Sequence, residues 1–234
     1  MIILENVSKS FGNMDAARNI SLTVASGEIF GLVGPNGAGK TTTIRMMTGL
    51  IRPDSGRICF GEYDIVRDPI RAKASFGYVP DRSFLYEKLT AREFLYFVAS
   101  LYGMKKKEAA ERGENLLDLF GISDAADELI EGFSQGMRQR LLFASALVHD
   151  PEALIIDEPF IGLDPFGVRT LINVLKGLSE KGTGIFLATH SLRIAEEVCH
   201  RVGLIKKGAL LTIKDRDELQ GIEGGLEGFF FGMK

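Results

Sequence analysis

The sequence predicts an α/β fold with a parallel β-sheet at its centre. Two short, almost continuously apolar runs, ALIID (153–157) and GIFLATH (184–190), are flanked by turn residues, as is typical of strands buried on both faces of a parallel sheet. The segment after Pro165 predicts a helix between them, so the three elements form a strand–helix–strand unit. A third β-rich run, GEIFGLVG (27–34), ends in glycine and leads into a predicted helix over 41–50.

Strands also dominate the first part of the chain. Alternating apolar residues predict strands over 2–7 and 20–24, and RICFGEYDI (57–65) predicts a strand pair. The turn residues at 52–56 end the preceding helix. Towards the other end of the chain, VGLIKKGALLT (202–212) predicts a hairpin.

Helical periodicity dominates from about residue 90 to residue 150. The predicted helices cover 91–103, 104–121 and 136–150. The first carries an apolar stripe that favours packed core over a docking surface. Its members are Phe94, Phe97, Val98 and Leu101.

Two further segments have simple interpretations. The lysine run 105–107 favours a solvent-exposed helix face. The Gly/Phe-rich segment 224–234 fits either a frayed tail or a small contact patch. Neither segment indicates a separate domain, and the 234 residues suffice for one large α/β domain.

Composition excludes several classes of protein. The net charge is −3, from 28 Lys+Arg against 31 Asp+Glu, so nucleic acid is not the expected partner. Cys59 and Cys199 lie far apart outside any metal-binding pattern, which indicates buried, reduced thiols. The sequence lacks a secretory signal and any run of about 20 apolar residues. We therefore expect a soluble cytoplasmic protein that reaches a membrane only through a partner.

The segment GPNGAGKT (34–41) matches the phosphate-binding pattern GxxxxGK[ST]. Its glycines allow successive backbone N–H groups to point at a phosphate, and Lys40 adds positive charge for the β- and γ-phosphates. Thr41 is the expected Mg²⁺ ligand, and Thr42 is expected to contact the α-phosphate. The predicted nucleotide-binding residues of this loop are Gly34, Pro35, Asn36, Gly37, Ala38, Gly39, Lys40, Thr41 and Thr42.

Polar residues follow both apolar strands at their carboxyl ends, the edge where open α/β sheets bind ligands. Asp157 is expected to hold Mg²⁺ through water, and Glu158 to align the attacking water. Adjacent carboxylates can instead simply cap a loop. His190 follows the second strand; a lone histidine is usually structural, but beside these motifs it is expected to bond the γ-phosphate and hold Glu158 in register.

A second anion-binding element is predicted in FSQGMRQRL (133–141). Ser134 suits the N-cap of the following helix, whose first amides would bind an anion. This element is distant in sequence from Lys40, so the residues alone do not say whose phosphate it holds.

In their order along the chain, GPNGAGKTT, GYVPD, FSQGMRQRL, LIIDEPFIGLDP and ATH resemble the nucleotide-binding subunit of ATP-binding cassette (ABC) transporters. The resemblance covers nearly the whole chain. It implies an ABC ATPase fold, with a P-loop NTPase (RecA-like) core, an N-terminal antiparallel β subdomain and an inserted α-helical subdomain. The implied single domain spans 1–234, with the core in 1–81 and 151–234 and the helical subdomain in 82–150.

The resemblance also implies how the second anion-binding element works. Two subunits of the family meet head to tail, so Ser134 and Gly136 would grip the γ-phosphate of ATP bound to the neighbour. Asp164 lies in the loop expected to contact the opposing subunit. Phe11 matches the aromatic residue that stacks on adenine, and Asp81, where the family usually has glutamine, is expected near Mg²⁺. Gln135 and Met137 also replace the usual residues of the family pattern.

The function implied is ATP hydrolysis that drives transport, with ATP and Mg²⁺ bound and catalysis by Lys40, Glu158 and His190. The expected partners are a membrane-embedded permease and a second ATPase subunit, as homodimer or heterodimer. Asp81 and GMRQRL resemble the exporter branch, in which the ATPase sits on the inner face of the cell membrane. The alternatives are a soluble ABC ATPase acting on DNA or the ribosome, a small-molecule kinase with the same loop, and a catalytically silent regulator.

Overall fold

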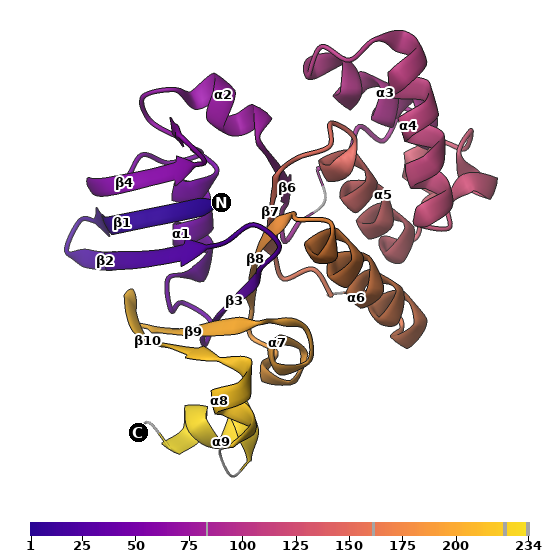
Figure 1. Cartoon of the computed structure of the whole chain (residues 1–234). Coiled ribbons are helices and arrows are strands. Elements are labelled where there is room, and N and C mark those ends of the chain that lie inside the picture. The colour runs from indigo at the N-terminus through magenta and orange to yellow at the C-terminus, as the bar shows by residue number, and fades with distance from the viewer. Residues whose placement is uncertain (83, 161, 222–223, 233–234) are drawn as a thin grey trace.

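The computed structural model describes residues 1–82, 84–160, 162–221 and 224–232. Within these residues one ten-stranded sheet runs through the molecule in the order β5-β4-β1-β2-β10-β9-β3-β8-β7-β6. Figure 1 shows the antiparallel strands on one side, the parallel strands at the centre, and a group of helices on the other side. Hydrophobic clusters fill both faces of the sheet.

The parallel strands lie together in one half of the sheet, with β6 at its edge. They are β3 (Ile29–Val33), β6 (Phe76–Val79), β7 (Ala153–Asp157) and β8 (Gly184–Thr189). Every residue of β3, β7 and β8 is buried, because helices cover both faces and only apolar runs can occupy such positions. The register pairs Asp157 with Ala188, which brings the carboxyl ends of β7 and β8 together.

The antiparallel part is formed mainly by the first sixty residues. It contains β1 (Ile2–Phe11), β2 (Met14–Val24), β4 (Ser55–Phe60) and β5 (Tyr63–Asp64). The hairpin of β9 (Arg201–Lys206) and β10 (Ala209–Asp215) joins this part to the parallel strands, since β9 pairs with β3 and β10 pairs with β2.

The helices fall into three groups. Beside the antiparallel strands and β6 lie α1 (Lys40–Met47) and α2 (Pro69–Ala74). On the opposite side lie α3 (Ala91–Leu101), α4 (Lys106–Leu119) and α5 (Gln135–Leu147), with two short 3-10 helices (Ser123–Ala125 and Ile130–Gly132). The later helices are α6 (Pro165–Glu180), α7 (Leu192–Val198), α8 (Arg216–Gln220) and α9 (Gly225–Gly232).

The helical side confirms some details of the sequence analysis and corrects one. Thr90 and Glu93 form a reciprocal capping box that fixes the start of α3. Phe94 is buried as predicted and Val98 is half-buried, but Phe97 is 37% exposed and Leu101 is 69% exposed. The core interpretation is therefore wrong for Phe97 and Leu101, because α4 and α5 cover only one side of α3. The lysine run 105–107 is exposed, as predicted.

The C-terminal segment is ordered as a helix over 225–232. Leu226 is buried, and its backbone N–H donates to the Glu196 carboxylate of α7 over 3.3 Å. These contacts contradict a frayed tail in this stretch, while 222–223 and 233–234 lie outside the described residues. Cys59 and Cys199 are free and buried, as expected. In the part of the chain that the structure describes, no helix is both long and apolar enough to span a bilayer.

Candidate functional site

The glycine-rich loop connects β3 to α1 and packs directly against the β9–β10 hairpin. Gly39 adopts φ +112°, and a Cβ there would lie 2.5 Å from the Ala16 carbonyl oxygen. A Cβ on Gly34 would lie 2.3 Å from the carbonyl oxygen of Ile205. Both positions therefore require glycine, which explains the pattern by backbone packing as well as by phosphate access.

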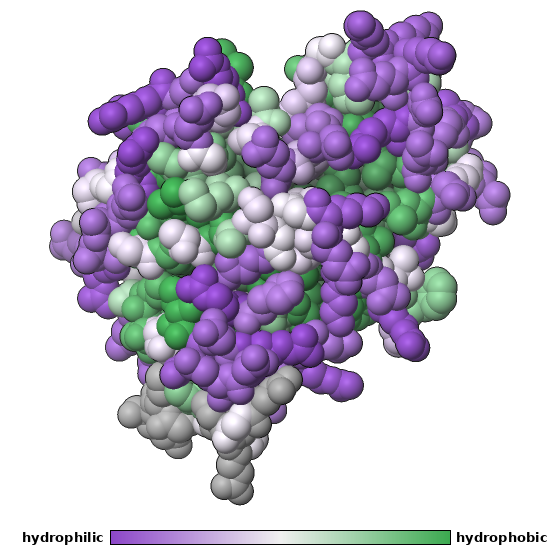
Figure 2. Space-filling view, viewed as in Figure 1, coloured by the Kyte–Doolittle hydropathy of each residue, from purple (hydrophilic) through white to green (hydrophobic). Residues whose placement is uncertain are grey.

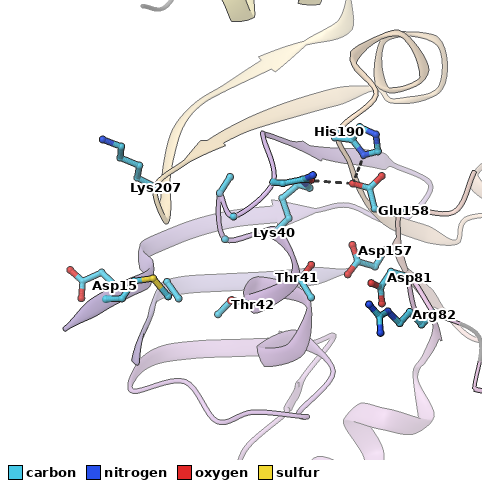
Figure 3. A pocket seen from close by; sticks show the side chains of 16 residues that line it. Asp15, Lys40, Thr41, Thr42, Asp81, Arg82, Asp157, Glu158, His190 and Lys207 are labelled. Atoms are coloured by element: carbon cyan, nitrogen blue, oxygen red, sulfur yellow. Dashed lines mark ion pairs between the residues drawn. The ribbon is translucent and has the colours of Figure 1, made fainter. Parts of the chain in front are cut away.

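A cavity of about 740 Å³ opens over this loop (Figure 3). It brings together most of the predicted site residues: Asn36, Gly37, Ala38, Gly39, Lys40, Thr41, Thr42, Asp81, Asp157, Glu158 and His190. Gly34 and Pro35 do not line it. Their carbonyl oxygens instead accept hydrogen bonds from Lys40, whose Nζ lies 2.7 Å from Gly34 O and 3.4 Å from Pro35 O.

Lys40 and Glu158 face one another across the cavity floor. Lys40 is 6% exposed, and its Nζ lies 3.7 Å from Glu158 Oε1. The same oxygen lies 2.9 Å from Nδ1 of His190. Figure 3 shows the three side chains converging from α1, from the end of β7 and from the end of β8. The carboxylate predicted to orient the attacking water therefore lies beside the cation predicted to hold the phosphates.

Asp157 is the buried acid of the pair. It is 1% exposed, and neither carboxylate oxygen has a hydrogen-bond partner among the described residues. Burial, together with the negative charge of Asp81, raises the pKa of Asp157 to about 6. A buried carboxylate without partners is costly, so this position is suited to a cation.

The residues present fit a magnesium ion of the nucleotide-bound kind. No group of three or more His, Cys, Asp or Glu residues in the described part of the chain forms a complete metal cage. Mg²⁺ commonly takes only one or two carboxylates and completes its shell with phosphate oxygens and water. Asp157, Asp81 and Thr41 all line the cavity, and Asp157 has both oxygens free to accept such a contact.

Besides Gly34 and Pro35, four other predicted residues do not line the cavity. Ser134 is the N-cap of α5, and its hydroxyl accepts from the Met137 amide over 3.3 Å. Asp164 caps α6 in the same way, accepting from the Gly167 amide over 2.6 Å. Gly136 follows Ser134 in the first turn of α5. The predicted second anion-binding element therefore lies outside the cavity of its own chain.

Phe11 is the fourth of these residues. It lies at the end of β1 opposite Met14, which itself lines the cavity. The Phe11 ring is 48% exposed, with the Lys9 ammonium 5.6 Å from its centre. The Phe11 ring is therefore not part of the hydrophobic core.

Several lining residues escaped the sequence analysis: Met14, Asp15, Ala16, Arg82 and Lys207. Arg82 adjoins Asp81, so sequence proximity could have suggested it. Lys207 reaches the site because the Gly208 amide donates to the Ala38 carbonyl over 2.8 Å. No local sequence pattern predicts this contact, because the two segments are far apart in the sequence. Thr189 was also missed, although its hydroxyl donates to Glu158 Oε2 over 3.2 Å.

A glycine-rich loop with its lysine, an acid pair and a histidine at the carboxyl edge of a parallel sheet define a nucleotide-hydrolysing P-loop protein. Comparison with known families is more specific: the family described as ABC transporter matches residues 17–161. The chain belongs to this family and is an ABC ATPase with the fold predicted from its motifs.

Individual relatives agree with this assignment. The chain is 39% identical over 225 residues to the linearmycin resistance ATP-binding protein LnrL of Bacillus subtilis (strain 168), covering 96% of this chain and 72% of the relative. It is 34% identical over 224 residues to the daunorubicin resistance ATP-binding protein DrrA3 of Streptomyces coeruleorubidus, covering 96% and 71%.

Solved structures agree as well. An ATP-binding subunit of an ABC transporter superposes with a TM-score of 0.92 at 30% identity, covering 99% of this chain and 98% of the other. The dimeric structure of MJ0796, a bacterial ABC transporter cassette, gives a TM-score of 0.85 at 25% identity, covering 92% and 99%.

Proposed function

We propose that this ATPase drives export through a separate membrane permease, and that two chains close over two ATP molecules to do so. The observation that carries the proposal is the convergence of Lys40, Asp157, Glu158 and His190 on one cavity. The relatives named for antibiotic resistance support the direction of transport, since resistance fits removal of a compound from the cell.

In this proposal the loop amides and Lys40 hold the β- and γ-phosphates, and Thr42 contacts the α-phosphate. Thr41, Asp157 and Asp81 would hold Mg²⁺, directly or through water. When bound, the ion neutralises charge on the phosphate oxygens. The exposed ring of Phe11 would stack on adenine, which explains an aromatic side chain left in solvent at the end of β1.

Glu158 is the proposed orienting residue for the attacking water. Its carboxylate is held within 2.9 Å of His190 Nδ1. The His190 side chain lines the cavity and is 57% exposed, so it would be free to contact the γ-phosphate as well. Lys40 would leave Glu158 when phosphate arrives, because a phosphate presents more negative charge at shorter range.

The second chain completes the site. Ser134 and Gly136 lie at a helix start outside their own cavity, where amides and the helix dipole favour an anion. In a head-to-tail pair this helix start would contact the γ-phosphate bound to the neighbour, with Asp164 beside it. The related cassette solved as a dimer supports such an arrangement.

The proposed contact with the permease is a crevice between the core and the helical region 82–150. A hollow of about 250 Å³ is lined from one side by Leu50 and Lys73 and from the other by Val98 and Tyr102. Leu50 is 62% exposed and Tyr102 41% exposed. Figure 2 shows the molecule notched where these two parts meet. A permease docked there would hold the protein on the inner face of the membrane.

The test is steady-state phosphate release by the purified protein and its Glu158→Gln variant. Wild-type protein should hydrolyse MgATP, and the variant should bind ATP but turn over at least about a hundredfold more slowly. The matched control is Glu152→Gln, an exposed residue just before the other end of β7, which should retain full activity. Undiminished turnover by Glu158→Gln would refute the assignment.

A further inference from the structure

The two carboxylate oxygens of Glu158 are held separately. Oε1 faces Lys40 and His190, at 3.7 and 2.9 Å. Oε2 instead accepts a hydrogen bond from the hydroxyl of Thr189 over 3.2 Å. With contacts on both oxygens the carboxylate cannot rotate freely about its terminal bond, which is otherwise a broad torsion.

The local hydrogen bonds also fix the direction in which Thr189 donates. Thr189 is 2% exposed at the end of β8. Its oxygen accepts from the Ser191 amide over 3.1 Å, so the single hydroxyl hydrogen is available for Glu158. A threonine hydroxyl has only one donor, and an ionised carboxylate can only accept. Thr189 is therefore the donor and Glu158 the acceptor in this hydrogen bond.

The backbone explains why the two side chains meet. Asp157 is still paired with Ala188 in the β7–β8 ladder, and the Glu158 amide donates to the Ala188 carbonyl over 2.9 Å. Glu158 then turns out of the ladder with φ +49°, a conformation that costs free energy in a residue other than glycine. The turn directs its side chain to Thr189 and His190.

We propose that Thr189 is a positioning residue for ATP hydrolysis. Its hydroxyl holds Oε2 so that the carboxylate presents a fixed lone pair to the attacking water. This inference rests on the proposed function, in which Glu158 orients that water. Each carboxylate oxygen has two lone-pair sites, so the bond from Thr189 leaves room for the water. Small losses of alignment have large effects on rate.

The test compares Thr189→Val, which replaces the hydroxyl with a methyl group of similar shape, with wild-type protein. A lost hydrogen bond to a charged group corresponds to roughly a ten- to hundredfold change. We expect kcat to fall by about that factor while KM for ATP stays within about twofold. Thr189→Ser, which restores the hydroxyl, should return kcat to within about threefold of wild type.

Two controls separate positioning from structural damage. Thr183→Val makes the same chemical change beside the opposite end of β8, where the residue is half-buried, and should leave kcat unchanged. ATP affinity should be equal in Glu158→Gln and in Glu158→Gln/Thr189→Val, because the hydroxyl acts through Glu158. If Thr189→Val does not fold, the comparison uses Thr189→Ala, which lacks the hydroxyl, and Thr189→Ser, which keeps it.

The outcomes distinguish this inference from the proposed function. If Glu158→Gln is inactive while folded Thr189→Val keeps kcat within twofold of wild type, the positioning role is overturned and the proposed function stands. A fall in kcat that Thr189→Ser does not restore overturns it as well. If Glu158→Gln hydrolyses ATP normally, the proposed function itself fails.

Discussion

Replacing Asp157 with asparagine should stabilise the nucleotide-free protein while abolishing its magnesium-dependent activity. Asp157 is buried without a hydrogen-bond partner among the described residues, close to the charge of Asp81. An ionised group in such surroundings destabilises the folded state. The asparagine side chain has nearly the same shape and no charge, so the penalty disappears together with the ability to bind the cation.

The magnitude follows from the pKa of about 6 against an ordinary value of 3.8. This rise in pKa means that ionised Asp157 lowers the free energy of unfolding by about 3 kcal/mol at pH 7.5. Because the pKa is higher in the folded state, the free energy of unfolding is greatest below the pKa of the unfolded chain, 3.8, and decreases as the pH rises through about 6. Burying the asparagine amide has its own smaller cost. We therefore expect the free energy of unfolding of the variant to be about 2 kcal/mol higher than that of wild type at neutral pH, which corresponds to a rise in Tm of about 4–8 °C.

The assay is urea and thermal unfolding without nucleotide or Mg²⁺ at pH 5.0 and 7.5. At pH 5.0 wild-type Asp157 is mostly protonated, so the advantage of Asp157→Asn should shrink from about 2 kcal/mol to roughly 0.6 kcal/mol. Asp124→Asn, an exposed residue, should change stability by less than about 0.5 kcal/mol. A variant less stable than wild type at pH 7.5, or a difference independent of pH, would refute the reasoning.

Two other changes test the site and the core. Lys40→Ala should weaken MgATP binding by at least about a hundredfold in titration calorimetry, because the variant lacks the buried ammonium group. Replacing the exposed Lys107 in the same way should leave binding unchanged. Tight binding by Lys40→Ala would contradict the assignment. Burial lowers the pKa of His149 to about 4. The free energy of unfolding should therefore be highest above pH 6.5 and should fall as the pH drops towards 4, because the folded protein keeps His149 neutral. His149→Phe keeps an aromatic ring against Tyr102, and its free energy of unfolding should fall by roughly 2 kcal/mol less than that of wild type between pH 7 and pH 5. An equal fall in the variant and in wild type would exclude His149 as the source.

The central strands and the chemical motifs could be predicted because both are local. ALIID and GIFLATH are apolar throughout, and only strands buried on both faces tolerate such runs. The acids and the histidine directly follow those strands, so their meeting at one edge was a consequence of parallel pairing. The glycine-rich loop likewise needed no distant information.

The missed elements have identifiable physical reasons. β6 contains Gly77, which weakens a strand pattern, yet a Cβ there would lie 2.1 Å from the Ala146 carbonyl of α5. That glycine is required by helix packing that no local pattern reveals. α2 and α7 are too short to show periodicity, although Asp68 before Pro69 is a helix-start signal that could have been used.

The remainder of the site depends on contacts between distant segments. Lys207 and Asp15 line the cavity because the hairpin and β2 pack against the loop. The role inferred for Thr189 depends on the left-handed turn at Glu158, which its sequence does not predict. Glutamate has no preference for that conformation, so only the folded arrangement discloses the contact.

The most direct test of the two-chain active centre is the mass of Glu158→Gln in solution with saturating ATP. Sedimentation equilibrium at tens of micromolar protein should give twice the mass of one chain with ATP, and one chain without it. The double variant Glu158→Gln/Ser134→Ala should remain largely monomeric with ATP, because the neighbour's γ-phosphate loses its second contact. A single-chain mass for Glu158→Gln at saturating ATP would contradict the account.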